Sequence, residues 1–311
     1  MRASLTAGVS RFHETKAEEI AILRTVLYAS LFEYPLTLTE VQQTLIESSM
    51  TSAEILRTYQ SSACLRAALE HREGCFVPVG RRGWIAQRRR RESRSWALIN
   101  RHRRLLGLLK HLPFVRMVAL SGSVAALNAD GRADLDLFVI TRGARVWLVG
   151  LLVVVLSKLV GKRRLICLNY VLSDEQLPID RQDLFAANQI IQLRPLSGAD
   201  AFRTFVAANP FVARFYPNFR PEQRLHWVAA PGVWERCVKP VLEAVLAPPS
   251  RLLDVACRAV YGWHLRRRST SWRSPDQVTL GRGCLKLHTQ SHRRHSLERF
   301  ERLLATYLSV Y

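Results

Sequence analysis

The chain has 311 residues, enough for about two domains of ~150 residues, and 48% of them are hydrophobic. This composition can bury a sizeable core, which excludes a disordered tail protein. Lys and Arg number 46 against 25 Asp and Glu, so the formal net charge is +21. Such a surface attracts polyanions, which makes nucleic acid, nucleotides and acidic membranes candidate partners. A codon bias toward Arg is the alternative, although it does not explain the deficit of acidic residues.

The cysteines and the apolar segments predict a cytoplasmic protein. The six cysteines include no CxxC pair, and the chain is too long to need disulfide staples, so we expect reduced thiols. The N-terminal residues have no apolar run typical of a secretory signal. Residues 146–157 form an uncharged stretch of twelve residues, whereas a membrane span needs ~20. We therefore expect a buried helix there and no integral membrane span, with peripheral membrane contact as the alternative.

Residues 1–90 predict three helices followed by two short strands. The helical segments are 17–32, 39–45 and 51–70, and the strands are 74–80 and 84–87, with Arg81 and Arg82 in the turn between them. This order is that of a winged-helix-like domain, in which the two arginines would lie at the tip of the wing. A helical bundle with a surface hairpin gives the same pattern, and a winged helix can bind protein instead of DNA.

Residues 91–181 predict an α/β core with a mixed α+β sheet. A basic helix over 92–111 is followed by apolar strands at 114–120, 135–140 and 164–172, with the apolar helix at 144–160 between the last two. Residues 182–311 show helical periodicity interrupted by prolines, and they predict a helical C-terminal region. Its clearest helices are 184–192, 199–208, 233–246, 250–268 and 292–308.

The clearest chemical signal is Gly122-Ser123 at the end of the first apolar strand, followed by Asp134 and Asp136 at the start of the second. Residues two apart on a strand face the same side, so the two carboxylates should lie side by side and repel each other unless a cation is bound. Mg²⁺ (or Mn²⁺) suits such a pair because it binds one or two carboxylates together with substrate phosphates. The glycine allows a phosphate to approach the backbone closely.

This arrangement resembles the DNA polymerase β-type nucleotidyltransferase superfamily, over residues 92–175. The matching residues are Ser121-Gly122-Ser123 and Asp134-Leu135-Asp136. The resemblance implies that Ser121, Gly122 and Ser123 hold the triphosphate of an NTP substrate and that Asp134 and Asp136 are catalytic metal ligands. Active members usually carry a third carboxylate on a later strand, where this chain has Asn169. Asp174, or an acid at 175, 180 or 183, is the candidate replacement.

The expected function is metal-dependent transfer of an NMP from an NTP to an acceptor hydroxyl, with release of pyrophosphate. The sequence does not identify the acceptor. If no third acid serves, the alternative is a catalytically weak or inactive nucleotidyltransferase-like protein that binds nucleic acid or regulates another process. A third interpretation is that the two aspartates have a structural role, in which they form ion pairs with nearby arginines such as Arg132 or Arg142.

Overall fold

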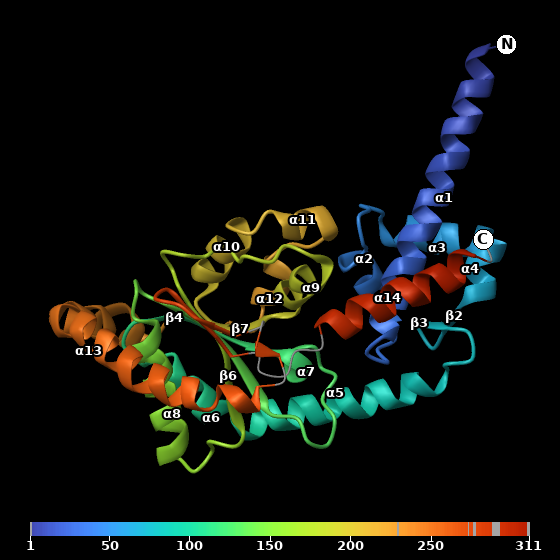
Figure 1. Cartoon of the computed structure of the whole chain (residues 1–311). Coiled ribbons are helices and arrows are strands. Elements are labelled where there is room, and N and C mark those ends of the chain that lie inside the picture. The colour runs from blue at the N-terminus through green and yellow to red at the C-terminus, as the bar shows by residue number, and fades with distance from the viewer. Residues whose placement is uncertain (1, 229, 273, 276–277, 288–292, 310–311) are drawn as a thin grey trace.

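The computed structural model describes residues 2–309 except 229, 273, 276–277 and 288–292 (Figure 1). The fold is mixed α/β, as predicted, with a three-stranded sheet near the N-terminus and a six-stranded sheet in the body of the molecule. For residues 2–15 only the helical backbone is described. None of the helices in the described residues is long and apolar enough to cross a membrane.

The N-terminal part contains helices packed on a small antiparallel sheet of order β1-β3-β2. Thr37 and Thr51 begin two of the helices through capping boxes with Glu40 and Glu54, which satisfy the free N–H groups of the first turns. The elements are α1 (Arg2–Ser30), β1 (Leu36–Thr37), α2 (Leu38–Gln43), α3 (Ser52–Ser61), α4 (Ala63–Ala68), β2 (Leu69–Arg72) and β3 (Cys75–Pro78).

The strand predicted at 84–87 is wrong, because these residues belong to the first turns of the long helix α5 (Gly83–Arg101). The hairpin lies earlier, between β2 and β3, and turns at Glu73 and Gly74, both with positive φ. Arg81 and Arg82 therefore lie in the connection to α5 and not at a hairpin tip. Ile85 is buried against the hairpin residue Val77, which explains why an apolar residue follows the turn.

The six-stranded sheet has the order β7-β4-β5-β6-β9-β8. Its strands β5 and β6 run parallel and are joined by helix α8, while every other neighbouring pair is antiparallel. The predicted strands β4, β5 and β6 are confirmed, but residues after 182 add three short strands that the helical prediction did not include. The elements are β4 (Val115–Ser121), β5 (Leu135–Thr141), α8 (Val146–Leu159), β6 (Ile166–Ser173), β7 (Arg194–Ser197), β8 (Val278–Leu280) and β9 (Cys284–Leu287).

Helices cover both faces of this sheet (Figure 1). On one face Leu135, Leu137 and Val139 pack toward α8, α6 (Arg103–Leu109) and α13 (Lys239–Arg267). On the other face Phe138 and Ile140 join a core that continues into the N-terminal helices. The elements on this second side are α9 (Leu184–Gln192), α10 (Ala199–Ala207), α11 (Phe211–Phe215), α12 (Glu222–Leu225) and α14 (Arg293–Leu308), the last of which contacts α1.

The helix α8 is largely buried, as its apolar sequence predicts. Two separate helices were expected after residue 233, but a π-helical turn at Trp234–Val238 leads into the single helix α13, which continues through Pro248 and Pro249 to a short 3₁₀ turn at Ser269–Ser271. Buried polar side chains fix α13 to the body. The Asp254 carboxylate accepts hydrogen bonds of 2.9 Å from the N–H groups of Trp147 and Leu148, in the first turn of α8.

Replacing Asp254 by Ala is expected to lower the free energy of unfolding by about 2 kcal/mol. The change leaves two buried N–H donors at the start of α8 without an acceptor, which costs more than the loss of a typical surface contact. Urea unfolding measures the effect. Asp200→Ala is the matched control, since the Asp200 side chain is fully exposed and solvent screens its ion pair with Arg203, so the change should hardly affect stability. Equal effects of the two variants would contradict the assignment.

Candidate functional site

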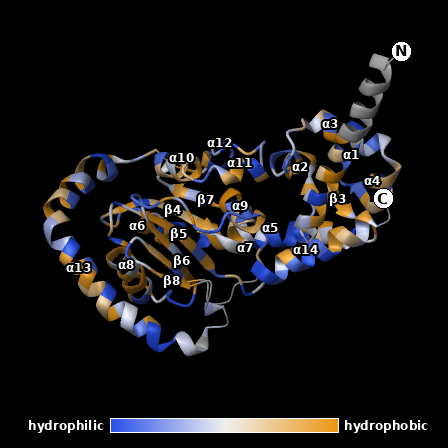
Figure 2. Cartoon of the chain, turned by 45° about the horizontal axis from the view of Figure 1, so that its top comes forward, coloured by the Kyte–Doolittle hydropathy of each residue, from blue (hydrophilic) through white to orange (hydrophobic). Residues whose placement is uncertain are grey.

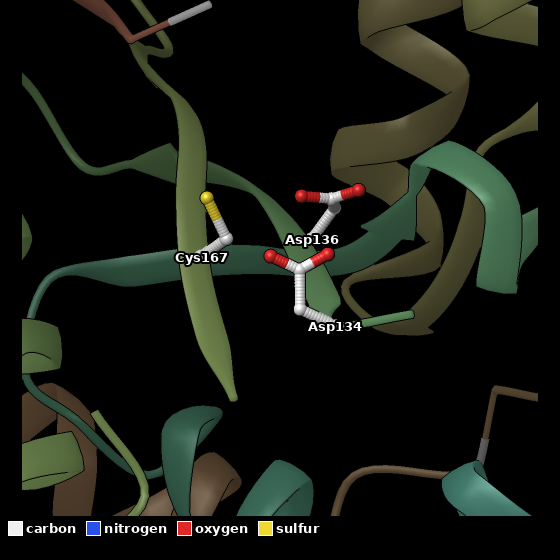
Figure 3. A group of neighbouring side chains, drawn as sticks. All are labelled: Asp134, Asp136 and Cys167. Carbon is white, nitrogen blue, oxygen red and sulfur yellow. The ribbon is translucent and has the colours of Figure 1, made fainter. Parts of the chain in front are cut away.

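Asp134 and Asp136 lie together at the N-terminal end of β5 in the six-stranded sheet, and their carboxylates are neighbours, as predicted. Asp134 directly precedes β5, and Asp136 is on β5 opposite Ser121, the last residue of β4. The short helix α7 (Gly122–Ala125) begins immediately after Ser121. Figure 3 shows the two carboxylates close together and near the thiol of Cys167, which comes from the neighbouring strand β6. One oxygen of each carboxylate and the Cys167 sulfur all lie within 4.8 Å of one another.

Cys167 and Asn169 occupy the position where a third acid was expected. The parallel pairing places Cys167 opposite Asp136, and the register then shifts after Leu137 so that Tyr170 pairs with Phe138. Asn169 therefore falls at an irregularity of β6, and it lines the same cavity as its neighbours Cys167 and Tyr170. The Cys167 thiol donates a hydrogen bond of 3.2 Å to the Asn169 side-chain oxygen.

The electrostatics of the pair favour a bound cation. Burial, together with the nearby charge of Asp134, raises the pKa of Asp136 to about 7, although hydrogen bonds from Asn169 and Cys167 act in the opposite direction. Burial and the two aspartates raise the pKa of the Cys167 thiol to about 12, so it stays protonated at neutral pH and is a poor ligand for a hard cation. The two carboxylates fit Mg²⁺ or Mn²⁺, and the thiol does not contribute.

The structural alternative, in which arginines neutralise the aspartates, is not supported. Arg142 forms an ion pair of 3.0 Å with Glu243 on the far side of the sheet. The backbone N–H of Arg132 donates to Asp130. Within the described part of the chain, neither Asp134 nor Asp136 has a Lys or Arg partner within ion-pair distance. Ion pairs with arginine therefore do not explain why the two carboxylates lie together.

Two features of the structure require glycine at position 122. Its φ of +67° lies in the left-handed region that other residues adopt only with strain. A Cβ atom built on Gly122 would also lie 2.1 Å from an oxygen of Asp136, so a side chain here would displace the carboxylate. Ser121 and Ser123 flank it at the cavity wall, and the Ser121 hydroxyl is buried without a hydrogen-bond partner in the described structure. An oxygen-rich ligand could satisfy this hydroxyl.

Asp174 does not belong to this site, which corrects the sequence-based candidate. It follows the opposite end of β6, seven residues beyond Cys167, which corresponds to roughly 20 Å at the rise of a strand. There it accepts a hydrogen bond of 2.7 Å from the Gly143 N–H and lies 3.7 Å from Arg116. Asp183 is also elsewhere, since it caps α9 and binds Arg293.

The acidic pair opens into a cavity of about 790 Å³. Its walls come from three distant parts of the chain, namely the site strands, α9 with Asn188 and Gln189, and α1 and the turn after it with Thr25, Tyr28 and Phe32. The Tyr28 hydroxyl is buried without a partner in the described structure. A volume of this size accommodates a small molecule such as a nucleotide. The contribution of α1 has no signal in the sequence, because it depends on how the N-terminal helices pack against α9.

Comparison of the chain with models of protein families, with curated proteins and with solved structures gave no match. The chemical interpretation therefore depends on the geometry of the site itself.

Metal binding at the acidic pair is expected to strengthen as the pH rises. A cation binds the ionised form of Asp136, which is a minority below its pKa of about 7, so the apparent affinity for Mn²⁺ should rise nearly tenfold per pH unit from pH 5 to 6.5 and level off above pH 7.5. Isothermal titration calorimetry of the wild type and of Asp136→Asn checks this. A pH profile that keeps its slope in Asp136→Asn would contradict the role of this carboxyl group.

Proposed function

We propose that the chain is a metal-dependent nucleotidyltransferase that transfers an NMP from an NTP to an acceptor hydroxyl. The observation that carries the proposal is a pair of carboxylates without cationic partners beside a Gly-Ser turn, at the wall of a cavity large enough for a nucleotide. In the reaction the acceptor oxygen forms a bond to the α-phosphorus. The bond to the bridging oxygen breaks, pyrophosphate leaves, and the hydroxyl proton passes to solvent.

Each site residue has a distinct role in this proposal. Asp134 and ionised Asp136 bind Mg²⁺ or Mn²⁺ together with the triphosphate, while Gly122 lets the phosphates approach the backbone of α7. The hydroxyls of Ser121 and Ser123 are donors for phosphate oxygens. When bound, the metal stabilises the negative charge of the attacking and leaving oxygens. Asn169 accepts a hydrogen bond from the protonated Cys167 thiol, which fixes the orientation of this neighbour of the two aspartates.

The N-terminal part is proposed to be winged-helix-like over residues 1–90. Its helices α1, α2 and α3 surround an antiparallel sheet in which β1 pairs with β3 and β3 with β2, and this order supports the proposal. In this chain the unit has a second role, because α1 forms one wall of the cavity. The acceptor is then expected to enter between the N-terminal part and the sheet.

A specific observation favours a second candidate, a nucleotide-binding protein with weak or absent transfer activity that acts on nucleic acid. Cys167 and Asn169 stand on β6 where a third carboxylate would help to hold the metal that activates the acceptor. Without that carboxylate, binding of a metal-NTP complex persists and the chemical step is slow. The net charge of +21 then supplies the attraction for DNA or RNA.

Thermal unfolding of the purified chain with each of the four NTPs, with and without Mg²⁺ or Mn²⁺, tests both candidates. Binding raises stability by ~2.7 kcal/mol at a hundredfold excess over Kd. A metal-dependent shift together with pyrophosphate release in the presence of RNA, DNA or the protein itself supports the transferase. A shift without release, combined with salt-dependent nucleic-acid binding, supports the second candidate. No shift with any NTP overturns both.

A further inference from the structure

Figure 2 shows that α13 lies at the margin of the molecule with apolar segments along its length. On its outward side, exposed apolar side chains form a stripe. Because an α-helix rotates by 100° per residue, the apolar side chains of the stripe fall on one side of the helix. Each is more than half exposed, up to 76% for Leu252. The stripe consists of Val241, Val245, Leu252, Val255, Val260 and Trp263. Single exposed apolar side chains are ordinary, but a stripe that runs along most of a 29-residue helix indicates an interaction surface.

Four polar side chains of α13 are directed toward the protein. Lys239, Glu243, Ser250 and Asp254 are all buried. The Lys239 ammonium donates to the carbonyls of Lys110 and Val115, and Glu243 accepts from the Phe114 N–H at 2.7 Å. A surface helix normally packs its apolar side on the core and turns its polar side to water. On α13 the apolar residues Leu246, Tyr261 and Leu265 pack on the core, and the buried hydrogen bonds fix the same side to the body. The second apolar side, the stripe, therefore stays outside.

The charges around the stripe are positive. The acidic residues of α13 are Glu243 and Asp254, and both are buried in hydrogen bonds, whereas Arg251, Arg266 and Arg267 are exposed. The neighbouring end of α8 adds exposed Lys158 and Leu159. Two tryptophans, Trp234 and Trp263, are exposed near the two ends of the stripe. An apolar stripe bordered by arginines and tryptophans suits the boundary between lipid headgroups and acyl chains.

We propose that the outward side of α13 binds the surface of an anionic lipid bilayer, with the stripe in the headgroup–acyl boundary and the arginines among the phosphates. Because the other side of α13 is fixed to the body, the helix lies along the membrane surface and does not cross it. Charge complementarity favours lipid over a second copy of the chain. Two copies packed stripe to stripe would bring arginines against arginines, with no exposed acid on α13 to pair with them.

Co-sedimentation with vesicles of phosphatidylcholine and phosphatidylglycerol (70:30) tests the proposal, with pure phosphatidylcholine vesicles in parallel. The wild type should bind the mixed vesicles at least tenfold more strongly than the neutral ones. Val245→Glu/Leu252→Glu should reduce binding to the mixed vesicles at least tenfold. The matched control Val79→Glu/Leu308→Glu makes the same charge change at exposed residues on other elements and should bind within twofold of the wild type.

Two results would overturn the proposal. If Val245→Glu/Leu252→Glu binds mixed vesicles as well as the control variant does, then attraction comes from other basic surfaces and not from the stripe. A second result is that the wild type does not bind vesicles and elutes as a dimer in size-exclusion chromatography, while Val245→Glu/Leu252→Glu elutes as a monomer. In that case α13 binds a second copy of the chain and not lipid. Thermal unfolding shows whether both variants remain folded, which is expected because all four residues are exposed. The vesicle readout does not depend on nucleotide transfer.

Discussion

Asp134→Asn and Asp136→Asn are each expected to abolish the metal-dependent stabilisation by NTP and to reduce nucleotide transfer at least ~100-fold. Both changes keep the size of the side chain and remove one of the two carboxylates that are proposed to bind the metal. Calorimetry with Mn²⁺ and the best NTP measures the loss of binding, and pyrophosphate release measures the loss of transfer. Retained transfer in either variant would remove the metal assignment.

The same variants should not unfold the protein. The pKa of Asp136 is about 7 in the native state and near 4 in the unfolded chain, so the native state holds its proton more tightly between these values. Stability from this group is present below pH 4 and is lost as the pH rises to 7. Asp136→Asn should therefore be more stable than the metal-free wild type at pH 8, by ~2 kcal/mol after discounting for solvent in the cavity.

Asp174→Asn is the matched control for both variants. It makes the same chemical change at a carboxylate that the sequence placed near the site and the structure places at the opposite end of β6. An asparagine oxygen can still accept the Gly143 N–H, so stability, NTP binding and transfer should stay close to wild type. Loss of NTP binding in Asp174→Asn with retention in Asp134→Asn would invert the assignment of the site.

Gly122→Ala is expected to weaken NTP binding at least tenfold. The new methyl group would fall on the Asp136 carboxylate, so either the carboxylate or the turn must move. Alanine in the left-handed region adds a strain of about 1 kcal/mol. Thermal unfolding with and without Mg²⁺-NTP separates the two effects, because strain lowers the stability of the free protein and displacement of Asp136 removes the shift on binding.

Gly161→Ala isolates the strain from the displacement. Gly161 follows α8 with the same φ of +67°, but a Cβ atom there has no atom within 4 Å. This variant should lose about 1 kcal/mol of stability and bind NTP like the wild type. If Gly161→Ala and Gly122→Ala bind NTP equally well, the close approach of Gly122 to Asp136 has no role in the site.

The central strands and the acidic pair could be predicted from the sequence, since they depend on local patterns. The run Leu135–Thr141 is apolar and β-branched, and residues two apart on it must face one side. Cys167 was missed as a neighbour of the pair. The same alternation applied to β6 would have found it, once β5 and β6 are taken as parallel strands joined by α8. This parallel pairing also excludes Asp174, because equivalent ends of parallel strands lie together.

Other elements could not be read from local patterns. Strands β7, β8 and β9 have only three or four residues each. Pairing with strands far away in the sequence stabilises β7 and β9, and β8 in turn pairs with β9. The prediction of a strand at 84–87 was wrong because these residues and the Arg-rich residues after them form one helix, α5. Pro248 and Pro249 suggested a break in α13, but contacts such as that of Asp254 with α8 keep the helix continuous through the bend.

The order of strands in the sheet has a consequence for biosynthesis. The edge strand β7 pairs with β4 across about eighty residues of sequence, and β9 pairs with β6 across more than a hundred. Helix α14 then closes on α1 through contacts such as Phe300 with Tyr28, whose rings are 5.1 Å apart. The last described wall residue of the cavity is Leu287 on β9, so a ribosome must release nearly the whole chain before the cavity has all its walls. Nascent chains should consequently acquire ligand-dependent protease resistance only after residue 287 has emerged.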